Sequence, residues 1–186
     1  MDRVENRRIV SGALGCPVCG AEYPIEDGVV CFAATEAATS SAPDPDVAMR
    51  IAAGLGLVAA NVVAILDGTW GCHAPLVRAL APAQVILLNP PRGVESADGI
   101  SVVRAARVPF AAGSVDGVAV DATHELAWRQ SLIRVVKAGG RAFSDVSLSA
   151  DGDVSEVFAS EGVWIGEVQH AGPTVSLQRA GAIKRL

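Results

Sequence analysis

A glycine-bearing loop that directly follows a buried strand is the part of this sequence best suited to binding a ligand. The apolar run 62–66 ends in Asp67, and the loop 68–74 then reads Gly-Thr-Trp-Gly-Cys-His-Ala. In an open α/β sheet, ligands bind at the carboxyl ends of the strands, where glycines let the backbone come close and the next helix N-terminus favours negative charge. Asp67 and Gly71 are therefore candidate cofactor-binding residues.

A second strand end offers a related group. The run 84–88 is followed by Asn89 and then by Pro90-Pro91. In a nucleotide-binding sheet an acidic residue at this point accepts hydrogen bonds from ribose hydroxyls, and an asparagine oxygen can also accept, without the charge. Asn89 is the third candidate cofactor-binding residue.

The segment after a predicted strand at 117–120 carries titratable groups. Asp121, His124 and Glu125 lie close together there, so Asp121 and His124 are candidate catalytic residues. The alternative is structural, since Asp121 can cap a helix and Glu125 favours its first turn. Cys72 near a helix N-terminus permits a nucleophile with His124 or His170 as its base, but the sequence favours a small buried cysteine instead.

The N-terminal segment has the spacing of a metal site. Cys16-Pro-Val-Cys19-Gly forms a turn that lets two thiolates meet one zinc ion, and Cys31 supplies a third ligand. Cys72 or His73 would be the fourth. The alternative is that these cysteines are reduced thiols that bind nothing. Residues 23–25 and 29–32, separated by Glu-Asp-Gly, predict a hairpin.

Strands and helices alternate along the rest of the chain, which predicts an α/β fold. Asp46 is the expected cap of the first helix, and Gly139-Gly140 the expected turn before the fifth strand. Only eleven residues, 89–99, separate the second and third strands, so no helix is expected between them. The predicted helices cover 47–57, 72–81, 124–137 and 153–161, and the predicted strands cover 62–66, 84–88, 100–104, 117–120, 141–146, 163–169 and 174–179.

In order and spacing, the loop after Asp67, the segment 108–116 and the segment 134–141 resemble class I S-adenosylmethionine-dependent methyltransferases. The resemblance covers about residues 48–186. It implies a three-layer Rossmann-like sheet, mostly parallel with a C-terminal antiparallel hairpin. The segment Cys16-Pro-x-Cys19 with 23–29 resembles the small zinc ribbons that precede some bacterial methyltransferases, but the second cysteine pair of a full ribbon is missing.

The contact residues depart from what this resemblance implies. Thr69 and His73 stand where loop glycines are expected, Trp70 is bulky, Asn89 replaces an acid, and Arg104 aligns near an adenine-facing carboxylate. Losing two bonds to charged acceptors costs about 1.5–3 kcal/mol each. This loss weakens S-adenosylmethionine binding by roughly two to four orders of magnitude.

Composition narrows the remaining classes of protein. The 186 residues are 51% hydrophobic with a net charge of −5, and no basic stripe suggests nucleic acid. The apolar run 51–66 is too short and too polar to span a membrane, and no export signal is visible in 1–14, so a cytoplasmic protein is expected.

We therefore predict a zinc-ribbon-like segment 1–34, a linker 35–46 and a methyltransferase-like domain 47–186. The predicted function is that of a degenerate methyltransferase homologue with weak or absent S-adenosylmethionine turnover, which acts through self-association or a protein partner. The alternative is an active S-adenosylmethionine-dependent methyltransferase with a small-molecule acceptor.

Overall fold

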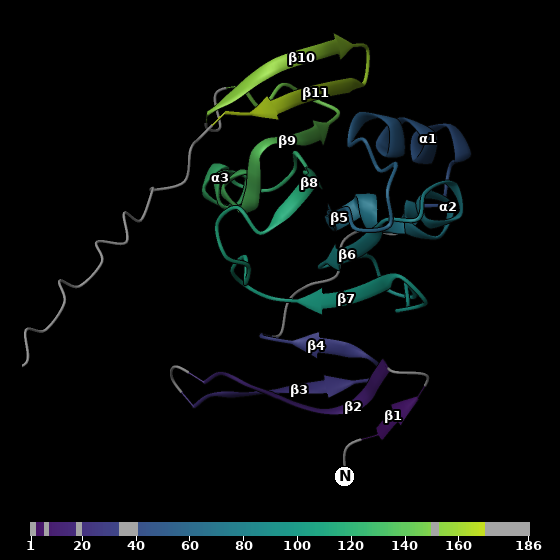
Figure 1. Ribbon diagram of the computed structural model, residues 1–186, viewed down its shortest axis with the longest axis vertical. Coiled ribbons are helices and arrows are strands. Elements are labelled where there is room, and N and C mark those ends of the chain that lie inside the picture. The colour runs from purple at the N-terminus through teal and green to yellow at the C-terminus, as the bar shows by residue number, and fades with distance from the viewer. Residues whose placement is uncertain (1–2, 6–7, 18–19, 34–40, 150–152, 170–186) are drawn as a thin grey trace, which may run out of the picture.

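The computed structural model describes residues 3–5, 8–17, 20–33, 41–149 and 153–169. Within them, eleven strands form one sheet in the order β1-β2-β3-β4-β7-β6-β5-β8-β9-β11-β10 (Figure 1). The strands are β1 (Arg3–Glu5), β2 (Arg8–Gly15), β3 (Glu22–Glu26), β4 (Val29–Cys31), β5 (Val63–Asp67), β6 (Gln84–Leu88), β7 (Ile100–Arg104), β8 (Val115–Ala119), β9 (Val136–Ser144), β10 (Val154–Ser160) and β11 (Val163–Val168).

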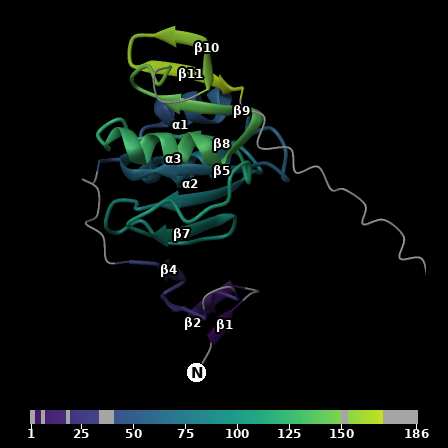
Figure 2. The ribbon, with the colours of Figure 1, turned by 90° about the vertical axis from the view of Figure 1, so that its left-hand side faces the viewer.

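The centre of the sheet has the predicted three-layer α/β architecture. Strands β7, β6, β5, β8 and β9 are parallel, and β11 and β10 close the sheet in antiparallel register. Helices α1 (Pro45–Gly54) and α2 (Ala74–Leu80) cover one face, and α3 (Leu126–Val135) covers the other. Figures 1 and 2 show the helices on the two sides of the sheet.

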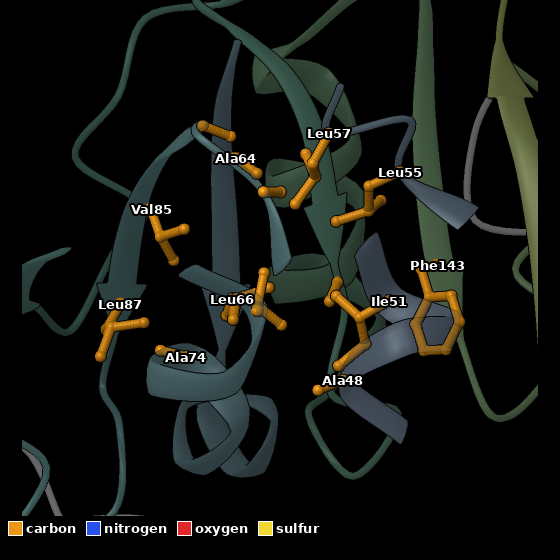
Figure 3. Close-up of a cluster of buried hydrophobic side chains, with 14 of the residues drawn as sticks. Ala48, Ile51, Leu55, Leu57, Ala64, Leu66, Ala74, Val85, Leu87 and Phe143 are labelled. Atoms are coloured by element: carbon orange, nitrogen blue, oxygen red, sulfur yellow. The ribbon is translucent and has the colours of Figure 1, made fainter. Parts of the chain in front are cut away.

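Each face of the sheet has its own apolar cluster, because the central strands are buried on both sides and carry apolar residues at nearly every position. Ala48, Ile51 and Leu55 from the α1 region pack on Leu66 and Phe143 (Figure 3). On the opposite face, Leu132 and Ile133 of α3 pack against strand residues that include Ile65 and Val118. These two layers hold the carboxyl ends of β5, β6 and β8 in place.

Helix α1 begins earlier than predicted. Asp44, not Asp46, is its N-cap, and the Asp44 Oδ1 accepts hydrogen bonds from the amides of Asp46 and Val47 at 2.8 and 3.3 Å. Pro45 occupies the first helical turn, where its fixed φ and missing N–H are tolerated. The expected cap was wrong because proline extends the helix by one position before Asp46.

The connections around β7 contain no helix among the described residues 89–114, as the short 89–99 spacing predicted for the first of them. Two other predictions were wrong. The segment 153–161 is strand β10 rather than a helix, so the closing hairpin is β10–β11, while 174–179 lies outside the described residues. Gly139 and Gly140 lie within β9, where the ladder with β8 shifts register between Val115 and Gly117.

The N-terminal strands belong to the same sheet as the main domain. Strands β3 and β4 form the predicted hairpin, and both turn residues, Asp27 and Gly28, have positive φ, as a two-residue hairpin turn requires. Strand β4 then pairs in parallel with β7, with Val30 opposite Val103. The meander β1–β4 therefore extends the central sheet past the edge that β7 would otherwise form. None of the described helices is long and apolar enough to cross a membrane.

Candidate functional site

Strand β5 delivers Asp67 to the carboxyl edge of the sheet, and the loop after it is a short 3₁₀ helix, η1 (Gly68–His73). The chain turns sharply at Gly68, whose φ is +55°. A Cβ atom at Gly68 would lie 2.5 Å from Asp121 Oδ2. Only glycine fits here, because the side chain of Asp121 fills the space in front of the loop.

Asp67 is fully buried, and every contact to its carboxyl group comes from the segment that follows β8. Trp128 Nε1 donates to both oxygens at 3.2 Å, and the Asp121 amide donates to Oδ2 at 3.3 Å. His124 Nε2 lies 3.5 Å from the same oxygen. Burial raises the pKa of Asp67 to about 8, against the lowering effect of the bonds from Trp128 and Asp121. At neutral pH this group is mainly a neutral acid.

Asp121 accepts four hydrogen bonds from two threonines. Its Oδ2 accepts from the amide and hydroxyl of Thr69 at 2.9 and 2.8 Å, and Oδ1 accepts from those of Thr123 at 3.0 and 2.7 Å. Burial acts to raise its pKa, but the bonds from Thr123 and Thr69 outweigh burial and lower it. Asp121 thus ties η1 to the loop before α3. All four of its hydrogen bonds come from residues of this chain.

Asn89 also binds its own chain. Its Nδ2 donates to the Ala105 carbonyl and its Oδ1 accepts from the Ala105 amide, both at 2.9 Å. The residue is buried with φ at +51°, a conformation that asparagine tolerates better than most residues. The side chain therefore pairs the loop after β6 with the loop after β7.

Gly71 and Trp70 complete the packing of this edge. A Cβ atom at Gly71 would lie 2.7 Å from Pro90 Cβ, so the loop after β5 contacts the loop after β6 directly. Trp70 Nε1 donates to the Val120 carbonyl at 2.9 Å, and its ring packs edge-on against Phe143 at 5.4 Å. Arg104 Nη1 donates to the Pro90 carbonyl at 3.3 Å.

The structure brings Asp67, Asp121 and His124 together, with Gly71 in the loop directly after Asp67 and Asn89 in the neighbouring loop after β6. Three partners were not predicted from the sequence: Thr69 binds Asp121, Ala105 binds Asn89, and the Trp128 indole binds Asp67. No sequence signal identified the Ala105 partner, because the contact uses backbone atoms. The Trp128 contact could have been predicted, because Trp128 follows His124 by four residues and residues at this spacing lie on the same face of a helix.

The cysteines do not form the four-ligand site considered from sequence. No group of three or more His, Cys, Asp or Glu side chains that could hold a metal exists among the described residues. A zinc site that joins Cys16 and Cys31 to Cys72 or His73 would be such a group. The prediction that Cys72 or His73 is the fourth ligand was therefore wrong. Cys72 Sγ instead contacts Ser41 Oγ at 3.2 Å, and His73 Nδ1 accepts from the Asp44 amide. Cys19 lies outside the described residues, so the set Cys16, Cys19 and Cys31 stays a prediction.

The strand order, the layers and the closing antiparallel hairpin are those of the class I methyltransferase fold. The sequence itself matches no protein-family profile, and no curated protein is similar to it in sequence.

Solved structures resemble the chain at low identity. They include a candidate S-adenosyl-L-methionine-dependent methyltransferase from Methanococcus maripaludis (11% identity, TM-score 0.49, 70% of this chain and 87% of that one). Another is a SAM-dependent methyltransferase from Aquifex aeolicus (12% identity, TM-score 0.45, 66% of this chain and 96% of that one). A third is geranyl diphosphate C-methyltransferase from Streptomyces coelicolor (15% identity, TM-score 0.45, 53% of this chain and 42% of that one).

The residues at this edge do not fit S-adenosylmethionine in the way that the family resemblance implied. The position to which the resemblance assigns the ribose contact holds Asn89, whose oxygen and nitrogen are both bonded to Ala105. The loop glycine at 71 packs on Pro90 rather than facing open space.

Proposed function

We propose that this chain is a methyltransferase-fold protein that does not turn over S-adenosylmethionine and acts through protein contacts, by self-association or with a protein partner. The observation that carries the proposal is the pair of hydrogen bonds between the Asn89 amide and the Ala105 backbone. These bonds use the side chain that would otherwise meet the ribose.

The energetic cost of freeing that side chain supports the proposal. A ribose that took both bonds of Asn89 would leave the amide and carbonyl of Ala105 buried without partners. Each such loss costs about 1–3 kcal/mol. Two of them reduce affinity by roughly one to four orders of magnitude, before any cost of separating Gly71 from Pro90.

The charge at the strand end supports it as well. S-adenosylmethionine carries a sulfonium and an ammonium group, which a carboxylate attracts. Asp67 is mainly protonated at neutral pH because burial raises its pKa to about 8. Binding through this group would require the release of a proton first.

The test is calorimetric titration of the full chain with S-adenosylmethionine and with S-adenosylhomocysteine, together with thermal unfolding in the presence of each. A ligand at one hundred times its Kd adds about 2.7 kcal/mol of stability, which raises the Tm by several degrees. We expect neither heat nor a Tm change up to millimolar ligand. A micromolar Kd would overturn the proposal.

A second candidate function is methylation of a small molecule. It is favoured by one observation, the buried Asp67 beside His124 at the carboxyl end of β5, because perturbed titratable groups at this point of an α/β sheet often belong to ligand sites. If the titration gives micromolar binding, Asp67→Asn and Asn89→Ala should each weaken it. An acceptor screen that follows S-adenosylhomocysteine formation would come next.

A further inference from the structure

The two edges of the sheet differ in how they are protected. Within the described residues the sheet ends at β1 on one side and at β10 on the other. Edge strands expose unpaired N–H and C=O groups, and proteins protect them with short strands, lysines, prolines or β-bulges; β10 has one register shift of this kind, at Val157. Strand β1 has three residues, whereas β10 has seven and contains no Lys, Arg or Pro.

The side chains of β10 are also suited to contact with another protein. Val157 and Phe158 are 54% and 50% exposed, and the ladder with β11 shifts register between Glu156 and Phe158, which leaves Val157 without a partner residue in that ladder. Glu156 is the strand's one charged residue, and its Oε2 accepts a bond from Trp164 Nε1 at 2.8 Å. This bond ties the Glu156 side chain to β11, so the carboxylate is held by its own hairpin.

A cavity of about 520 Å³ opens beside this edge, between α1 and the β10–β11 hairpin. Phe158, Val163, Ile165, Ala53 and Gly54 supply its apolar lining. In Figure 1, β10 lies at the end of the molecule opposite the N-terminal meander. Phe158 is both exposed on β10 and part of the cavity lining. We use the name β10 surface for the cavity lining together with its exposed neighbour Val157: Arg50, Ala53, Gly54, Val157, Phe158, Ser160, Glu161, Val163 and Ile165.

The charges of the β10 surface match those of its own copy. Arg50 and Glu161 both line the cavity, and neither has an ion-pair partner in the part of the chain that the structure describes. A two-fold axis places a surface against itself. One cation and one anion on the same surface can then pair twice, Arg50 with the Glu161 of the other copy and the reverse.

We propose that a second copy of this chain docks on the β10 surface, edge to edge, to form a two-fold symmetric dimer. This proposal rests on the proposed function, since it names the partner in the self-association. The register shift at Val157 interrupts a regular ladder, so the side chains of Val157 and Phe158 contribute the apolar contact. Arg50 and Glu161 set the orientation.

Sedimentation velocity and light scattering of the full chain, from low micromolar to a few hundred micromolar, test the dimer. We expect a concentration-dependent dimer, and Val157→Lys should raise its Kd by about tenfold or more, equivalent to about 1.4 kcal/mol. Leu80→Lys is the matched control, because Leu80 is 57% exposed at the end of α2 and outside the β10 surface. It should leave the Kd unchanged.

A charge swap tests the orientation. Arg50→Glu and Glu161→Arg should each weaken the dimer, and the double variant should restore it, because the two pairs are rebuilt with opposite signs. A dimer that survives Val157→Lys, or that Leu80→Lys weakens equally, would overturn the proposal. A protein that stays monomeric at every concentration would also overturn the proposal. If amide exchange in β10 of that monomer is already slow, residues of the same chain cover the edge.

The same samples separate this proposal from the proposed function. A monomer that binds no S-adenosylmethionine overturns the dimer but leaves a different protein partner as the route of action. A dimer that turns over S-adenosylmethionine overturns the proposed function and leaves the interface intact.

Discussion

The indole of Trp128 and the carboxyl group of Asp67, 61 residues apart in the sequence, meet at the carboxyl end of β5, where Nε1 donates to both oxygens at 3.2 Å. This contact closes α3 onto the strand end. Together with the bonds of Asp121 to Thr69, it ties the loop after β5 to the loop after β8, and the bonds of Asn89 to Ala105 tie the loops after β6 and β7. The close packing of Gly71 on Pro90 joins these two pairs of loops. The edge that binds ligands in this type of sheet is therefore held by internal contacts.

The first prediction concerns the pH dependence of stability. Because folding raises the pKa of Asp67 to about 8, the folded state binds this proton more tightly than the unfolded state. The contribution of the protonated Asp67 to the free energy of unfolding is complete below the unfolded pKa of about 3.9. It is lost as the pH rises toward 8. The difference in unfolding free energy between the wild type and Asp67→Asn should fall by about 1.4 kcal/mol per pH unit between these limits.

Urea denaturation of both proteins at several pH values measures this slope. His124→Gln is the control, because it removes the neighbouring titratable group and keeps Asp67. A difference between wild type and Asp67→Asn that does not change with pH would show that Asp67 titrates normally.

The second prediction concerns Asn89. Asn89→Asp removes the donor to the Ala105 carbonyl and places a carboxylate oxygen against that oxygen, so we expect a loss of about 1–3 kcal/mol in unfolding free energy. Aspartate tolerates the positive φ as asparagine does, so the loss reports on the side chain. The variant restores the acidic residue of the family pattern, yet titration calorimetry should detect no gain in S-adenosylmethionine affinity. A gain would mean that the Ala105 contact gives way easily to a ribose.

The third prediction concerns the packing of η1 on the loop after β6. Gly71→Ala puts a methyl group 2.7 Å from Pro90 Cβ and 3.3 Å from its Cα, and overpacking of this kind costs about 1–3 kcal/mol. Gly15→Ala is a matched control, since a Cβ there would contact nothing within 4 Å. Thermal unfolding should separate the two variants clearly, and equal Tm values would count against the close contact.

The fourth prediction concerns the N-terminal meander. Ile25 is buried in β3, and β4 pairs with β7 of the central sheet. Ile25→Ala should therefore destabilise the whole protein by about 2–4 kcal/mol in one cooperative transition. If residues 1–34 and 47–186 instead unfold as separate domains, as the predicted division implies, two unfolding transitions should appear. The Tm of the larger domain would then be unchanged by the substitution. Calorimetry of both proteins distinguishes the outcomes.

The central α/β fold could be predicted from the amino-acid sequence alone. Strands β6 and β7 have the bounds that their apolar runs predicted, and the Asp27-Gly28 turn identified the β3–β4 hairpin, because buried apolar runs and positive-φ turns depend on local residue types. Strand β10 was mistaken for a helix. Only Val154 of its seven residues is buried, so no period-2 pattern was present, and pairing with β11 decided its conformation.

The tertiary structure alone decided what the strand-end residues contact. Asp67, Gly71, Asn89, Asp121 and His124 were identified as candidates from their positions after strands, and the fold does place them at one edge. Their partners lie up to 61 residues away and include backbone groups such as those of Ala105. Residue type shows that a side chain can form a hydrogen bond, but the packing of distant loops determines whether a ligand or the chain itself receives it.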